Sequence, residues 1–168
     1  TGAGGTGVDQ AGGTISAGGV ELTGSGLFSL LQSNAIGTLA ANLSGPASGL
    51  NVGNGTNLAV GTVGGTSGIT AGTSGVGLAI EGALAINQPI TAAGGDVLIV
   101  TSGAVTQSAP VTADLLSVAT RNDSGAAITL THAGNSVAAV ELSALDATLN
   151  AVAPGAISYA GAGGFDVL

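Results

Sequence analysis

Phe28-Ser29-Leu30-Leu31-Gln32-Ser33-Asn34-Ala35-Ile36 recurs about a hundred residues later, with one residue inserted, as Ile128-Thr129-Leu130-Thr131-His132-Ala133-Gly134-Asn135-Ser136-Val137. Matched segments on either side keep the same order, so that residues 7–60 correspond to residues 104–167. The offset between partners grows from 97 near the start to 107 near the end, as small insertions accumulate. A long internal repeat without reactive residues is typical of a solenoid, in which each repeat contacts only its neighbours.

A shorter repeat lies within the long one. Gln88–Ala92 is echoed about 20 residues later by Ala109–Ala113. Coils of about 20 residues with three short strands and glycine-lined corners are the unit of a parallel β-helix, whose strands stack about 4.8 Å apart. We therefore expect an all-β fold, a right-handed parallel β-helix of about eight coils of about 20 residues. It should form a single segment over residues 1–168.

Apolar residues two apart recur along the chain, which is the spacing that places side chains on one face of a strand. Examples are Leu58–Val60 and Val97–Val100. The segment from Val137 to Asn150 is rich in Ala and Leu, but its apolar residues lack a clean helical period, so we expect a strand there too. The glycine-dense stretch 45–77 is expected to loop out of the coils.

Composition favours a narrow aliphatic core. Hydrophobic residues make up 45% of the chain and aromatic residues 2%, with no Cys, Met or Trp. Val, Ile and Leu suit a core in which β-branched side chains stack on copies of themselves. The longest dense apolar run, Val97–Val100, is far too short for a membrane span of about 20 residues. The absence of methionine and the start at Thr1 favour a processed product or an internal piece.

The charge balance excludes a class of partners. Nine carboxylates are set against a single basic residue, Arg121, for a formal charge of −8. Nucleic-acid binding requires Lys and Arg along a face to release counterions, so it is excluded here. Anionic membrane surfaces attract basic segments, and we expect no membrane insertion. No cofactor is implied.

Two asparagines, Asn34 and Asn135, occupy equivalent places in the long repeat. Asparagine tolerates left-handed backbone at a corner, and its side chain can bond to the backbone of neighbouring turns. We expect both residues to form structural corner ladders.

Paired carboxylates are the enzymatic alternative, because acids on adjacent coils can cleave a glycosidic bond when they lie about 5 to 10 Å apart. The position numbers of Asp96 and Asp114 differ by 18, as do those of Asp123 and Glu141, and those of Asp146 and Asp166 differ by 20. Alignment of coil corners would produce the same spacing without catalysis. The scarcity of aromatic residues, on which sugar rings stack, further disfavours an enzyme.

The remaining candidate sites are weaker. His132 is the only histidine, and the repeat places Gln32 or Ser33 at its counterpart, which favours a plain polar corner residue over a member of a catalytic triad. Gly161–Asp166 is a single imperfect echo of the calcium-binding nonapeptide array. The sequence therefore predicts no catalytic residue and no metal site.

Five short segments resemble the shaft repeats of filamentous-haemagglutinin-type exoproteins. They are Gly103–Gln107, Pro110–Ala113, Ala127–Thr131, Gly155–Tyr159 and Gly164–Leu168. These are bacterial surface adhesins exported by two-partner secretion, and they are also similar to autotransporter passengers. The resemblance covers the chain from about Gly7 to its end. It implies a right-handed parallel β-helix, a secreted or cell-surface location, and a role in adhesion or matrix building.

Three expectations follow for function. The first is a non-catalytic shaft or filament segment that contacts extracellular matrix, a host surface or glycans. The second, from a different class, is a glycan-binding or polysaccharide-cleaving β-helix. The third, compatible with the first, is end-to-end self-association through exposed strand edges.

Overall fold

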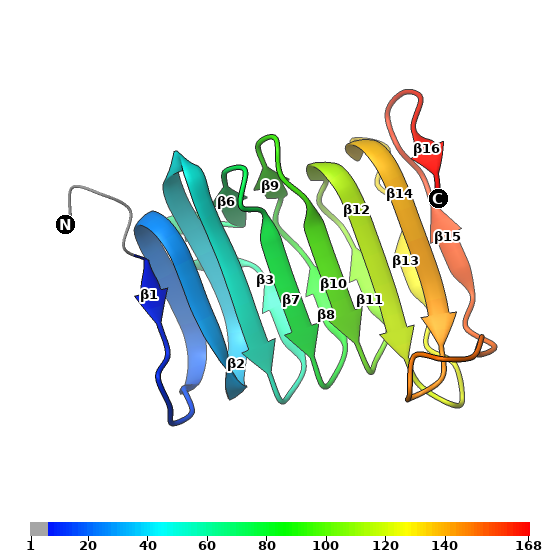
Figure 1. Ribbon diagram of the computed structural model, residues 1–168, viewed down its shortest axis with the longest axis horizontal. Helices are drawn as coiled ribbons and strands as arrows, with labels where there is room; N and C mark the ends of the chain where they lie inside the picture. The colour runs from blue at the N-terminus through cyan, green and yellow to red at the C-terminus, as the bar shows by residue number, and fades with distance from the viewer. Residues whose placement is uncertain (1–6) are drawn as a thin grey trace.

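The computed structural model describes residues 7–168, so residues 1–6 of the expected segment lie outside the described range. Within that range the chain forms strands and turns and no helix; accordingly, no described helix is long and apolar enough to cross a membrane. The strands stack along the long axis of the molecule, from β1 at one end to β15 and β16 at the other (Figure 1). Their bounds are β1 Val8–Asp9, β2 Ser16–Asn54, β3 Leu58–Val60, β4 Thr62–Val63, β5 Thr66–Ser67, β6 Ile69–Ala71, β7 Val76–Ile80, β8 Leu84–Ile86, β9 Ile90–Ala92, β10 Val97–Thr101, β11 Val105–Gln107, β12 Val111–Arg121, β13 Ile128–Leu130, β14 Ser136–Leu145, β15 Ile157–Tyr159 and β16 Asp166–Val167.

Three parallel ladders wind around one core, and we name them by their residues. Face A comprises residues 50–54 of β2, then β7, β10, residues 116–120 of β12 and residues 140–144 of β14. Face B comprises residues 38–39 of β2, then β3, β8, β11, β13 and β15. Face C comprises residues 41–42 of β2, then β6, β9 and the first residues of β12 and β14. The expected all-β parallel β-helix is confirmed.

The coils differ in length. Register partners on face A are, in order, Leu50, Val76, Val97, Leu116, Val140 and Val167, so the position number advances by 26, 21, 19, 24 and 27 from one coil to the next. Val8 lies opposite Phe28 at the N-terminal end, and the solenoid has about seven turns. The corners absorb the extra residues, which leaves the ladders in register.

The core is built by like side chains stacked coil on coil. On face A, Val97 and Ile99 lie opposite Leu116 and Val118, and all four are at most 1% exposed. Alternate residues point outward, as the period of a strand requires. Burial of each such side chain stabilises the fold by about 1.5–3 kcal/mol relative to exposure. A core of this width needs no large aromatic residues, which accounts for the aliphatic composition.

The glycine-dense stretch 45–77 stays largely within the coils, because it supplies residues 50–54, β3 and β6 to the three faces. The part that projects is an antiparallel hairpin of β4 and β5. The amide of Gly68 donates to the carbonyl of Gly61 at 2.8 Å, which closes the base of the hairpin. At its tip, Gly65 N–H donates to the Glu21 carboxylate at 3.2 Å, so the hairpin reaches back to an earlier coil.

Candidate functional site

Asn34 lies at a corner of the solenoid, where it is completely buried. Its Oδ1 accepts from the Ile15 amide at 2.8 Å and from Gln10 Nε2 at 2.9 Å. Its Nδ2 donates to the carbonyls of Leu30 and Gly53 and to Gln10 Oε1, at 3.0–3.1 Å. We call the pair Gln10 and Asn34 the N-terminal clamp. It joins three successive coils, because Gln10, Asn34 and Gly53 belong to three consecutive turns.

Asn135 repeats this arrangement near the other end of the solenoid and is 1% exposed. Its Oδ1 accepts from the Val111 amide at 2.9 Å and from Gln107 Nε2. Its Nδ2 donates to the carbonyls of Leu130 and Ala160 and to Gln107 Oε1. We call Gln107 and Asn135 the C-terminal clamp. Each bond has a counterpart in the N-terminal clamp.

The glutamines were not predicted as structural residues, although the signal was present. Both belong to the matched segments Gly7–Gln10 and Ala104–Gln107, at the fourth position of each. Gln10 Oε1 accepts from the amide of Gln32, and Gln107 Oε1 accepts from the amide of His132. A primary amide both donates and accepts, so the two side chains satisfy one another and the corner backbone together.

The two clamps lie at different corners of the cross-section. The N-terminal clamp comes after the strand that carries Phe28, and that strand stacks next to residues 50–54 of face A. The C-terminal clamp follows β13 on face B and is bonded to Ala160, just after β15. The long sequence repeat therefore marks one corner chemistry used at two corners of the cross-section.

Other buried polar side chains line the corner after face A. Asn54, Thr101 and Thr120 are 2%, 0% and 0% exposed and share one register column with Ile80. Asn54 Oδ1 accepts from the Ile36 amide at 2.8 Å, and Thr120 Oγ1 donates to the Ala126 carbonyl at 3.0 Å. These bonds satisfy backbone groups that leave the strand ladders at the corner.

The structure brings one of the predicted carboxylate pairs to adjacent register positions on neighbouring coils. Asp114 N–H donates to the Gly95 carbonyl at 2.9 Å, and Leu115 N–H donates to Asp96 Oδ1 at 3.2 Å. Asp96 and Asp114 thus lie beside each other at the corner between faces C and A, where both are exposed. One Asp96 oxygen is already engaged by the backbone of the next coil.

The other two pairs are not brought together. Glu141 lies opposite Ser117, whose Oγ donates to it at 3.1 Å, whereas Asp123 accepts from the Ala147 amide. The coil there is longer than the spacing of the two acids in the sequence, which separates them. Asp166 lies opposite Ala139, whereas Asp146 accepts from the amides of Thr148 and Asn150 within its own loop. The Asn150 amide is the largest of the influences that lower the pKa of Asp146.

His132 is a corner residue whose Nδ1 accepts from the Gly134 amide at 3.0 Å. Arg121, the single cation, forms an ion pair with Glu81 two coils away, and both side chains are partly exposed. Within residues 7–168, no group of three or more His, Cys, Asp or Glu side chains could hold a metal ion.

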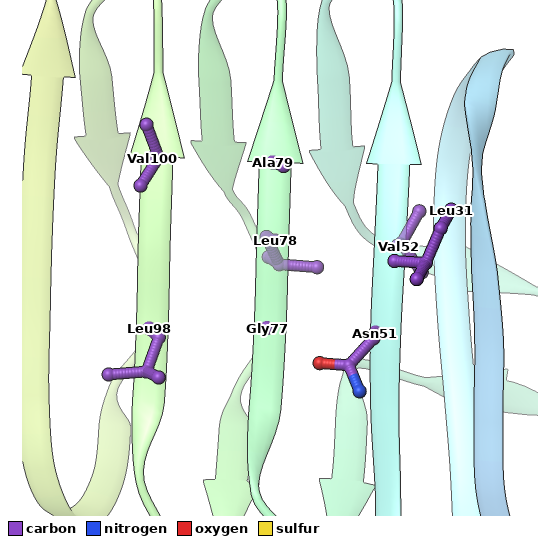
Figure 2. Close-up of a pocket in the computed structure, with 8 residues that line it drawn as sticks. All are labelled: Leu31, Asn51, Val52, Gly77, Leu78, Ala79, Leu98 and Val100. Carbon is purple, nitrogen blue, oxygen red and sulfur yellow. The ribbon is translucent and has the colours of Figure 1, made fainter.

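The outer side of face A carries a shallow apolar hollow (Figure 2). Its volume is about 220 Å³, and Leu31 and Leu98 stand on either side of it, 62% and 48% exposed. Gly77 and Ala79 lie between them, together with the amide of Asn51. No charged side chain lines the hollow. It offers contact surface for an uncharged group.

Comparison of the chain with protein-family models, with curated proteins and with solved structures gives no match. Arguments about function therefore rest on the chain itself.

Proposed function

We propose that this chain is a non-catalytic, tension-resisting segment of an extracellular bacterial shaft of the filamentous-haemagglutinin type. The observation that carries the proposal is the pair of Gln–Asn clamps, each of which ties three consecutive coils together through buried hydrogen bonds. Backbone hydrogen bonds on three faces run along the same axis. Bonds aligned with the axis oppose separation of coils under tension, which is the property a shaft requires.

The outer surface supports a structural role. On face C the outward positions stack Thr70, Thr91 and Thr112, and on face B they stack Thr106, Thr129 and Ser158. Carboxylates stand mostly singly, at corners and loops, where they keep an otherwise apolar chain soluble. A cell-surface or secreted location, with extracellular matrix, a host surface or glycans as partners, belongs to this proposal.

The proposal includes extension of the rod by stacking of a further coil on the last one, from the same polypeptide or from a second copy. An apolar hollow of about 270 Å³ faces that direction, lined by Val140, Leu142, Ile157, Tyr159, Phe165 and Val167. Ile157 and Val167 are 44% and 76% exposed, although they continue columns that are buried in earlier coils. A stacked coil would bury them and pair the strand edge.

Single-molecule force spectroscopy tests the mechanical role. The chain is held between two marker domains, and the wild type is compared with Asn34→Ala, Asn135→Ala and the exposed control Asn87→Ala. We expect unfolding at high force for the wild type and the control, and at lower force for both clamp variants. Equal unfolding forces for all four proteins would overturn the mechanical role.

A polysaccharide-cleavage assay tests the enzymatic alternative directly. The chain is incubated with a panel of acidic and neutral polysaccharides, and new reducing ends are measured. We expect none. Release of reducing ends that is lost in Asp96→Asn or Asp114→Asn would replace the structural proposal with a catalytic one, because these acids lie on neighbouring coils.

A further inference from the structure

Outward positions on face A differ in side-chain size from coil to coil along the solenoid axis. One column runs Asn51, Gly77, Leu98, Ser117 and Glu141, and its neighbour runs Gly53, Ala79, Val100, Ala119 and Ser143. Figure 2 shows Asn51, Gly77 and Leu98 in one row and Ala79 and Val100 in the next. In both columns the larger residue, Leu98 or Val100, stands next to a smaller one, Gly77 or Ala79.

A two-fold axis parallel to the strands, placed between β7 and β10, makes this surface complementary to itself. Rotation about that axis preserves the column and exchanges β7 with β10, so Leu98 of each copy meets Gly77 of the other, beside the Asn51 Oδ1 that lies over that glycine. Val100 then meets Ala79, and Ala119 meets the coil edge formed by Gly53 and the backbone of Leu31. An isologous contact of this kind uses the same patch on both subunits.

Polar groups also find partners across the same axis. Asn51 meets Ser117, whose Oγ donates to Glu141 and keeps its acceptor capacity for the Asn51 amide. We propose that face A is a self-association surface, on which two copies of this chain pair side by side with antiparallel solenoid axes.

Charge selects face A as the side on which a second copy can bind. The chain has a formal charge of −8, so two copies repel each other overall, and the repulsion is weakest where they meet across a surface without opposed carboxylates. The outward positions from Asn51 to Ala119 are uncharged. Glu141 lies three coils beyond β7, where the two-fold axis sets it against the coil that carries Leu31 and away from the partner's Glu141.

The available area suits a reversible dimer. The contact runs from the coil that carries Leu31 to residues 140–144, which is six rungs spaced about 4.8 Å apart, each about five residues or about 17 Å long. That gives roughly 490 Å² per copy and roughly 1,000 Å² in total, which is the size of a weak, reversible interface. We expect a dimer that forms and dissociates within the micromolar range. This contact is separate from the end-to-end stacking proposed above, because it buries a side of the rod.

Sedimentation equilibrium of the full chain from about 1 µM to about 1 mM tests the proposal. We expect a monomer–dimer equilibrium that saturates at the dimer. Leu98→Glu should raise the dissociation constant by about tenfold or more, because it places a carboxylate in an apolar contact. Thr70→Glu, which adds the same charge at an outward position on face C, should leave the equilibrium unchanged.

A residue exchange tests the axis itself. Gly77→Leu and Leu98→Gly should each weaken the dimer, the first by opposing two leucines and the second by leaving a gap. The double variant should restore it, since the leucine introduced at position 77 again faces a glycine. A monomeric wild type at about 1 mM, no recovery in the double variant, or equal loss in Thr70→Glu would overturn the proposal. Mass that grows without limit in the wild type and equally in Leu98→Glu would indicate end-to-end stacking alone and would overturn it as well.

Discussion

The N-terminal and C-terminal clamps contain the same side-chain pair and the same five hydrogen bonds from the asparagine, but they serve backbone groups of different burial. Asn34 accepts a hydrogen bond from the amide of Ile15, which is partly exposed. Asn135 accepts one from the amide of Val111, which is completely buried. The chemistry of a corner therefore recurs independently of how deep the corner lies. The loss of stability on replacing either asparagine should therefore increase with the burial of the backbone amide that it binds.

The surroundings of the two clamps differ as well. The same corner, one coil after Asn34, holds a second buried asparagine, Asn54, which bonds to both the amide and the carbonyl of Ile36. Beyond Asn135 lies the last coil, with Ala160 and the partly buried ring of Tyr159. The N-terminal clamp has a neighbour that shares its role, and the C-terminal clamp depends on the coil that covers it.

Replacement of the clamp asparagines should give the largest effect and separate the two corners. Asn135→Ala should lower the free energy of unfolding by about 3 kcal/mol, because the Val111 amide is left without a partner in the core. Asn34→Ala should cost about 1.5 kcal/mol, since water can reach the Ile15 amide. Chemical denaturation monitored by circular dichroism measures both values.

Asn87→Ala, at an exposed position, is the matched control and should change stability by less than about 0.5 kcal/mol. Equal losses at Asn34 and Asn135 would show that burial of the backbone amide does not set the cost.

Replacement of the glutamines should also reduce stability more at the C-terminal clamp than at the N-terminal clamp, but by smaller amounts than replacement of the asparagines. Gln107→Ala should cost about 1 kcal/mol and Gln10→Ala about half as much, because each asparagine keeps its bonds to the backbone when the glutamine is removed. A double variant that lacks both residues of one clamp should cost less than the sum of the single variants, as expected for groups that bond to one another. Strict additivity at either corner would mean that the pair does not act as a unit.

The fold was predictable because the coil length of a solenoid appears as a period in its sequence. Gln88–Ala92 and Ala109–Ala113 predicted coils of about 20 residues, and both segments supply face C, as β9 and the start of β12. Val137–Asn150 could have been mistaken for a helix from its Ala and Leu content, but its spacing favoured a strand, and β14 covers Ser136–Leu145. Core contacts in this fold are between neighbouring coils, so local periodicity is enough to indicate them.

Coil length was the part that periodicity could not supply. Insertions at corners add little to the entropic cost of closing a loop and leave the ladders unchanged. The coil from Leu116 to Val140 is longer than the one before it, and nothing in the sequence of its strands indicates this. That insertion is why equal spacing brought Asp96 beside Asp114 but left Asp123 away from Glu141. Partner choice at the clamps was equally hidden, since Gln10 and Asn34 are far apart in the sequence and meet only after a full turn.

Alkaline pH should affect the C-terminal clamp alone, and this is the smallest effect we expect. Burial raises the pKa of the Tyr159 hydroxyl above its ordinary value of 10.0, and the hydroxyl has no hydrogen-bond partner among the described residues. The unfolded chain ionises first, so the stability contributed by the neutral ring is fully present below the ordinary pKa and is lost as the pH rises through the raised value. The ring packs edge-on against Phe165 at 4.9 Å between centroids, and Tyr159 directly precedes the residue whose carbonyl Asn135 binds.

The single tyrosine makes this last difference measurable, because its near-ultraviolet absorbance reports the ionisation without overlap from another tyrosine. Isoleucine methyl NMR should show Ile157 responding together with that absorbance and Ile15 unchanged, and Tyr159→Phe should abolish the response. If Ile15 responds at the same pH, or if Ile157 still responds in the phenylalanine variant, the two ends of the solenoid do not differ in the way their surroundings imply.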